Sequence, residues 1–154
     1  MSYINLYYND QFGYIIASYT HVRDSIMYTV IDPVIYAGPL TTKYELAKYI
    51  EEGLYKSETS ELAERNQMGK YKFWQVNNIK SFSVFSKRFQ CIEVKKSNDY
   101  YTISVMLRCP DGSYTRSKNK EDTYQAPVSA DYETIAEIAM NVFGTIPAIQ
   151  IENN

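Results

Sequence analysis

Few side chains in this 154-residue sequence have the types and spacing that catalysis requires. The only histidine, His21, lies in the polar stretch THVRD and is the sole candidate for a base that titrates near neutral pH. Its polar neighbours favour a solvated surface position. Paired carboxylates such as Glu51 and Glu52 could carry acid and base chemistry, but adjacent helix residues point about 100° apart. We expect them to be solubilising charges and the protein not to be an enzyme.

Metal and cofactor sites also lack their usual residues. Two cysteines, Cys91 and Cys109, and the single histidine have no close metal-ligand spacing, so they do not predict a zinc site. Six scattered glycines form no turn that would bring backbone amides to a phosphate. We expect no metal, no cofactor and no small-molecule substrate, and both cysteines to be packed thiols without a lasting disulfide.

Charge is distributed unevenly along the chain. Residues 65–120 carry twelve bases and three acids, whereas residues 121–154 carry six acids and no base, giving sums of +9 and −6. Residues 1–42 and 43–64 sum to −2 and −3. Three interpretations are open. The acids could face a basic protein surface, the basic middle could bind single-stranded nucleic acid, or folding could pair the two and erase both patches.

The two binding hypotheses use different side chains. The sequence pI of about 5.5 favours the protein partner. For nucleic acid, the candidates lie in the basic aromatic segment 65–96, where Lys70 and Lys72 would contact phosphates and Trp74 would stack on bases. A solvated helix face is the simpler interpretation of the acids in residues 57–67. The predicted contacts to a protein partner are six carboxylates: Glu58, Glu61, Glu64, Asp131, Glu133 and Glu137.

Hydrophobic periodicity predicts strands in two blocks along the chain, most of them joined by turn residues. A proline at position 33 interrupts the third strand, because proline cannot donate to a strand ladder. The expected strands cover residues 3–8, 14–20, 27–36, 90–96, 100–109 and 114–118, with a charged loop at residues 118–127.

Helices are predicted after each block of strands. Residues 42–56 are the clearest, because Thr42 and Glu45 form a capping box before an apolar face. We expect one or two further helical turns in residues 57–67, a helix within 79–89, and a closing helix at 130–143. Ser129 would cap the closing helix at its start and Gly144 at its end. Together these elements predict an α+β fold, with helices covering a largely antiparallel sheet and some mixed pairing left open.

Length and hydropathy limit the architecture. A chain of 154 residues buries roughly 70% of its unfolded surface, so we expect residues 1–154 to form a single domain. The first ten residues lack a signal sequence, and no stretch approaches the ~20 apolar residues that cross a bilayer. We therefore expect a cytoplasmic protein without membrane contact.

The order of elements resembles the immunity proteins of bacterial contact-dependent growth inhibition systems. The resemblance covers residues 3–144 and follows the helix LTTKYELAKYIEEGLYKS, the segment around Trp74, the run SFSVFSKRFQCIEVKK, the strand DYYTISVMLRCPDGSY and the helix DYETIAEIAMNVF. In that family a leucine-bearing helix ending near a serine follows the first strands, as at Glu45, Leu46, Leu54 and Ser57.

The resemblance implies a non-enzymatic protein that binds the toxic C-terminal domain of a cognate delivered effector, often a nuclease, inside the producing cell and its siblings. An inhibitor of a nuclease is expected to place carboxylates where substrate phosphates would lie. The acidic flanks fit that expectation, whereas the basic middle does not. Contact residues vary among such proteins, so none is carried over to a position here.

Overall fold

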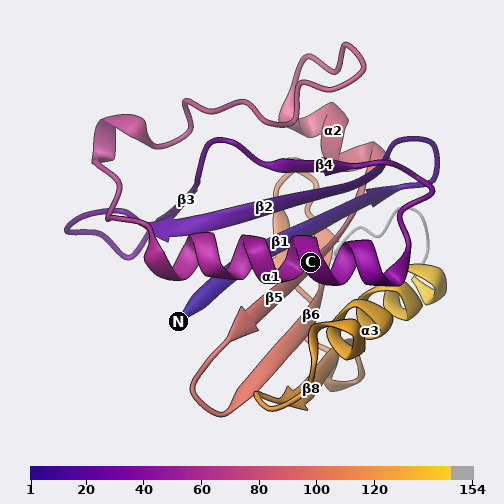
Figure 1. The fold of residues 1–154 in the computed structure, drawn as a ribbon. Coiled ribbons are helices and arrows are strands. Elements are labelled where there is room, and N and C mark those ends of the chain that lie inside the picture. Colours follow the sequence, from indigo (N-terminus) through magenta and orange to yellow (C-terminus); the bar gives the residue numbers. More distant parts are fainter. Residues whose placement is uncertain (147–154) are drawn as a thin grey trace.

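An eight-stranded sheet forms the centre of the molecule, and the computed structural model describes residues 1–146. Its strand order is β3-β2-β1-β5-β6-β7, while β4 also pairs with β2 and β8 with β6 (Figure 1). Every pairing between these strands is antiparallel, so the predicted α+β class with an antiparallel sheet is confirmed. The strands are β1 Ser2–Asn9, β2 Gly13–His21, β3 Tyr28–Val30, β4 Ile35–Ala37, β5 Gln90–Lys96, β6 Tyr100–Arg108, β7 Tyr114–Arg116 and β8 Thr123–Pro127.

The central strand β1 supplies side chains to a separate core on each face of the sheet. Leu6 pairs with Ile16 of β2 and with Ile92 of β5, and these three side chains lie in the first core. The next residue, Tyr7, points to the other face and is 1% exposed in a second core. Successive strand side chains point to opposite faces, so a strand covered on both sides can be apolar at most positions.

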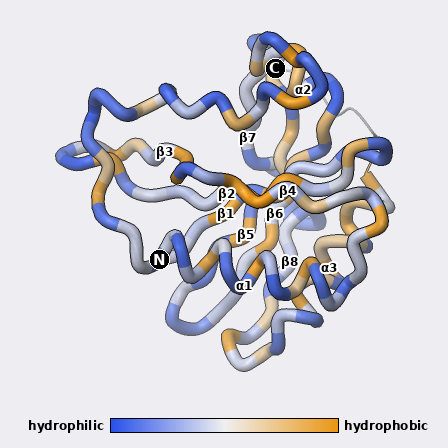
Figure 2. The backbone as a smooth tube through the Cα atoms, turned by 45° about the horizontal axis from the view of Figure 1, so that its top comes forward, coloured by the Kyte–Doolittle hydropathy of each residue, from blue (hydrophilic) through white to orange (hydrophobic). Residues whose placement is uncertain are grey.

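Two long helices cover the first core. Helix α1 (Lys43–Thr59) begins at the predicted capping box, where the Thr42 hydroxyl accepts from the Glu45 amide and the Glu45 carboxylate accepts from the Thr42 amide. Helix α3 (Tyr132–Thr145) lies beside α1 (Figure 1). In Figure 2 the strands are largely hydrophobic, whereas the chain that connects α1 to α2 is largely hydrophilic. The buried helix residues are Leu46, Ala47, Ile50, Gly53 and Leu54 of α1, and Ile135, Ala136, Ala139, Val142 and Phe143 of α3.

The second core is aromatic and is covered by residues 71–89, including the short helix α2 (Phe82–Arg88). Within it, the rings of Phe85 and Phe89 stack at 4.3 Å. Buried Arg108 of β6 donates from Nε to the Ser86 hydroxyl at 2.9 Å and from Nη2 to the Ser83 carbonyl at 3.3 Å. These bonds and the stacked rings hold α2 against the sheet, and α2 confirms the helix predicted within residues 79–89.

The predicted helical turns at residues 57–67 are wrong. Helix α1 continues to Thr59, after which the chain is extended to Glu64 and makes a short 3₁₀ turn, η1, at Arg65–Gln67. Ala63 forms a parallel bridge with Val22, which holds this stretch in an extended conformation beside the end of β2. Tertiary pairing has overridden the helical spacing of the glutamates.

Three other local predictions need correction. The charged loop expected at residues 118–127 contains a 3₁₀ turn, η2 (Lys120–Asp122), and the strand β8, which pairs with β6. Asp131, not Ser129, caps α3: its carboxylate accepts from the Thr134 amide at 2.9 Å. Gly144 lies inside α3, and the C-terminal cap is Ile146.

None of the helices within residues 1–146 is long and apolar enough to cross a membrane.

Gly13, at the β1–β2 turn, lies so close to β4 that a side chain there would meet the β4 backbone. Gly13 has φ of +99°, and a Cβ atom there would lie 2.3 Å from the Ala37 carbonyl oxygen of β4. Gly69 has φ of +76° with nothing near its Cβ position. We expect Gly13→Ala to lower the free energy of unfolding by about 3 kcal/mol, from backbone strain plus overpacking. Gly69→Ala, which adds strain alone, should cost about 1 kcal/mol. Urea unfolding measures both, and equal losses would contradict the close packing.

Candidate functional site

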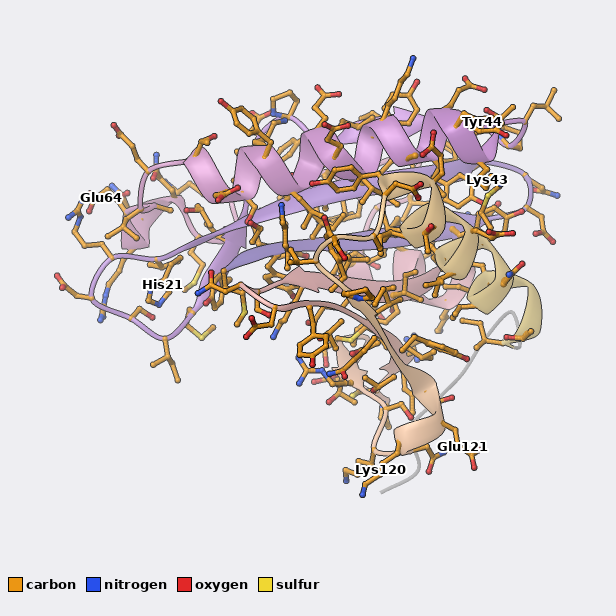
Figure 3. The ribbon with its side chains drawn as sticks, turned by 60° about the horizontal axis from the view of Figure 1, so that its bottom comes forward. His21, Lys43, Tyr44, Glu64, Lys120 and Glu121 are labelled. Atoms are coloured by element: carbon orange, nitrogen blue, oxygen red, sulfur yellow. The ribbon has the colours of Figure 1, made fainter. Side chains whose placement is uncertain are left out.

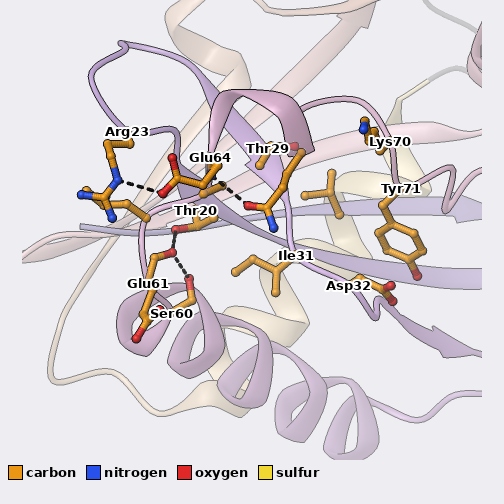
Figure 4. Close-up of a pocket in the computed structure, with 14 residues that line it drawn as sticks. Thr20, Arg23, Thr29, Ile31, Asp32, Ser60, Glu61, Glu64, Lys70 and Tyr71 are labelled. Carbon is orange, nitrogen blue, oxygen red and sulfur yellow. Dashed lines mark hydrogen bonds and ion pairs between the residues drawn. The ribbon is translucent and has the colours of Figure 1, made fainter.

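A groove of about 690 Å³ opens where the chain leaves α1 and passes the edge of the sheet. One wall comes from residues 60–71, named the linker here, and the other from β2, β3 and the residues that follow them. We call this cavity the linker groove. Figure 4 places Arg23 and Glu64 at one end and Lys70, Tyr71 and Asp32 at the other. The groove brings together three residues that the sequence analysis assigned to opposing hypotheses: Glu61, Glu64 and Lys70.

Backbone and hydroxyl hydrogen bonds fix the linker against β2. The Ala63 amide donates to the His21 carbonyl at 3.0 Å, and the Arg23 amide donates to the Ala63 carbonyl at 2.8 Å. The buried Thr20 hydroxyl donates to the Glu61 carbonyl at 2.8 Å (Figure 4). The groove wall is therefore preformed, and its charged side chains are held at defined positions.

Mixed charge characterises the linker groove. Glu64 pairs with Arg23 at 3.0 Å between Oε1 and Nε, and both side chains are more than half exposed. Asp32, Glu61 and Lys70 are also exposed. At the far end the Tyr71 hydroxyl accepts from the Val34 amide at 3.1 Å. An exposed ion pair stabilises the fold by less than about 1 kcal/mol, so the Arg23 and Glu64 charges are available to a partner.

The other predicted carboxylates lie elsewhere. Glu58, in the last turn of α1, lines a separate groove of about 370 Å³ together with Glu51, Glu52 and Tyr132. Glu133 and Glu137 are exposed on α3. Asp131 is engaged as the cap of α3, and hydrogen bonds donated by Thr134 lower the pKa of its carboxyl group. The six carboxylates therefore lie in three separate places, at the linker groove, at the end of α1 and at the start of α3, and do not form one acidic face.

The nucleic-acid candidates are also dispersed. Lys70 lines the linker groove, and Lys72 is exposed. Trp74 is half-buried at the second core, where its ring meets Phe82 edge-on at 6.4 Å. A ring that packs in a core offers only part of its face for stacking on a base. Of the three candidates, Trp74 is thus partly occupied by packing, whereas both lysines are exposed.

Ion pairs in the structure bear on charge cancellation between the acidic flanks and the basic middle. Within residues 1–146 they join Arg23 to Glu64, and Lys95 and Arg116 to Glu93. The Glu93 carboxylate is 6% exposed and lies 2.6 Å from Arg116. Two of these pairs lie within residues 65–120 and the third joins residues 23 and 64, so none of the three links the basic middle to the acidic flanks.

The histidine and the cysteines are not arranged for nucleophilic catalysis in the described chain. His21 is exposed and its ring lies 5.0 Å from the ring of Tyr28. Both cysteines are free, and burial raises the pKa of the Cys91 thiol well above its ordinary value. Cys109 is only half-buried, so the predicted packing holds fully for Cys91 alone. Residues 1–146 contain no group of three side chains that could hold a metal ion.

Sequence reasoning missed an exposed apolar segment beside the linker groove. Ile26, Met27 and Tyr28 follow the turn after β2, and the side chain of Ile26 is 91% exposed. The sequence carried a signal, since three consecutive apolar residues follow the polar stretch 21–25. The predicted strand at residues 27–36 includes Met27 and Tyr28 and leaves Ile26 outside. Only the structure shows that the strand begins at Tyr28 and that its first residues lie in solvent.

Solved structures share this fold, among them the following two chains. A chain of the CdiA-CT/CdiI toxin and immunity complex from Yersinia pseudotuberculosis matches with a TM-score of 0.68, covering 93% of this chain and 95% of that chain at 11% identity. A protein of unknown function from Neisseria meningitidis matches with a TM-score of 0.66, covering 95% of each chain, also at 11% identity. No protein-family model and no curated protein matches the sequence.

The agreement extends over nearly the whole of each chain, so the similarity concerns the complete fold and not one motif. The fold expected from the resemblance to immunity proteins is therefore confirmed. At 11% identity the comparison carries no residue roles to this chain.

The hydrogen bond from Thr20 to the linker is open to a direct test. We expect Thr20→Val to lower the free energy of unfolding by about 1 kcal/mol, because one hydrogen bond is lost without a change of shape. Amide hydrogen exchange at Ala63 and Arg23 should become faster. Thr29→Val is the matched control, because the Thr29 hydroxyl makes no hydrogen bond within residues 1–146 although it lines the same groove. Equal exchange in both variants would show that Thr20 does not hold the linker.

Proposed function

We propose that this chain is an immunity protein, which binds and neutralises the C-terminal toxin domain of a contact-dependent growth inhibition effector. The observation that carries the proposal is the near-complete fold match to a chain of a toxin and immunity complex. Such a protein acts in the cytoplasm of the cell that makes it, before the toxin reaches its target. Its activity is binding, and it requires no cofactor.

Two features of the chain support an inhibitor in preference to a toxin enzyme. The single histidine packs its ring against Tyr28 and is not paired with a nucleophile. The linker groove combines carboxylates with cations on an open surface. An open surface of mixed charge suits recognition of a protein, where complementary charge sets the encounter rate and the register.

Glu61 and Glu64 are the carboxylates that we assign to the toxin interface. They project from a linker that is held in place before binding, so little conformational entropy is lost in the complex. Glu58 lies two residues before the linker, and Glu133 and Glu137 on α3 form a second acidic site. The two acidic sites can be distinguished experimentally.

Co-expression tests the function itself. We expect cells that produce the C-terminal domain of the effector encoded directly upstream to survive when they also produce this chain. The two proteins should co-purify as a one-to-one complex. The control is a toxin domain from an unrelated effector, which should kill the cells regardless. Cell death together with the absence of a complex would refute the proposal.

Charge neutralisation tests the assigned face. We expect Glu61→Gln/Glu64→Gln to slow association with the toxin domain by about tenfold at low salt, because steering by complementary charge is lost. Glu133→Gln/Glu137→Gln makes the same change of charge on α3 and should leave the rate near that of the wild type. Stopped-flow or surface-based kinetics at two salt concentrations measures both variants. The opposite ranking would assign the interface to α3.

A further inference from the structure

The turn between β2 and β3 carries an unusual exposed surface. Ile26, Met27 and Tyr28, named the apolar tip here, are 91%, 50% and 47% exposed. Within residues 1–146 no other three consecutive residues all expose large apolar side chains. Single exposed apolar residues are normal, whereas a contiguous apolar patch marks an interaction site.

The apolar tip is rigid although it is exposed. Inside the turn, the Val22 amide donates to the Met27 carbonyl at 2.9 Å, and the Met27 amide donates to the Ser25 hydroxyl at 3.0 Å. From the linker, Arg65 Nη2 donates to the Asp24 carbonyl at 2.7 Å. A loop that is already held in one conformation loses little entropy when a partner binds it.

Stacked rings connect the apolar tip to the sheet. The Tyr28 ring lies 5.0 Å from His21 and meets Tyr3 edge-on at 5.6 Å, and Tyr3 stacks on Tyr19 at 4.5 Å. Tyrosines of this kind present a large apolar area with few rotatable bonds, which is why they are frequent among the residues that dominate binding energy.

Charges around the apolar tip identify the kind of partner. Arg23 and Arg65 are exposed beside the acids Asp24 and Glu64, so the rim holds two bases and two acids. Nucleic acid and anionic membranes select a rim that is mainly basic. An apolar centre inside a rim of both signs is the composition of a protein–protein interface. Figure 3 shows His21 and Glu64 at the same end of the molecule. Arg23 and Thr29, which flank the apolar tip in the sequence, both line the linker groove, so the tip and the groove are neighbours.

We propose that the apolar tip is the principal anchor of the toxin complex, with Ile26 inserted into an apolar pocket of the toxin domain and the charged wall of the linker groove forming the rim. This inference rests on the proposed immunity function and specifies its binding site. The partner surface should combine an apolar concavity with a cation facing Glu64 and a carboxylate facing Arg65.

The test compares two aspartate variants in complex formation with the C-terminal domain of the effector encoded directly upstream. Ile26→Asp should raise the dissociation constant at least about tenfold, as for a residue that dominates an interface. The control is Leu40→Asp, because Leu40 is 92% exposed and lies before the opposite end of α1, roughly 25 Å away along the helix. Thermal unfolding of each free variant should match that of the wild type. The NMR signal of His21, the only histidine, should shift on binding.

The outcomes separate this inference from the proposed function. Binding of Ile26→Asp with wild-type affinity would overturn the anchor and leave the immunity function intact. Equal weakening by Leu40→Asp would also overturn it, because the effect would then be one of charge alone. If the wild-type chain does not bind, both proposals fail. A second copy of this chain could also occupy the apolar tip, and sedimentation of the free protein tests for such a dimer. If the wild type is a dimer and Ile26→Asp is a monomer, the apolar tip serves self-association and the proposed anchor is overturned.

Discussion

Pairing of β1 with β2 on one side and β5 on the other is the constraint on which the rest of the structure depends. Leu6 is buried between Ile16 and Ile92, and that register sends each neighbouring residue to the opposite face. A shift of one position would exchange the contents of the two cores. The first core would then present Tyr7 and Asn5 to α1, and the second would present Leu6 to the aromatic layer.

The position of the proposed binding surface follows from this arrangement. Helix α1 crosses the first face and ends beside the last residues of β2, where Ala63 meets Val22. The carboxylates of the linker and the apolar tip therefore lie at one end of the sheet, although about 35 residues separate them in sequence. Hydrogen bonds join the linker to β2 and to the turn that follows β2, and they hold both the carboxylates' backbone and the apolar tip in place. Rigidity at this end is thus a property of the junction between the two segments.

Much of the fold was predictable because its signals are local. The capping box at Thr42, the interruption at Pro33 and the turn at residues 110–113 all use side chains that act on their own backbone. The linker and β8 were missed because their conformation comes from pairing with distant strands, Val22 for the linker and β6 for β8. The glutamates of the candidate site were identified by type, but helical spacing predicted the wrong face. The three consecutive apolar residues of the apolar tip are visible in the sequence, but their exposure is a property of the folded surface and was therefore missed.

The layer over the second face is attached to the sheet through side chains, as the helices on the first face are. Within the described chain, residues 65–80 form no backbone ladder with the sheet and are held by side chains, such as the Tyr36 hydroxyl on the Phe73 carbonyl and the Phe73 ring on Tyr7. Strand register therefore does not depend on the length of this stretch. Changes at its exposed positions can remodel the surface next to the linker groove while the buried residues Phe73 and Ile79 keep the second core covered. A scaffold of this kind can diversify its specificity rapidly and keep a single architecture.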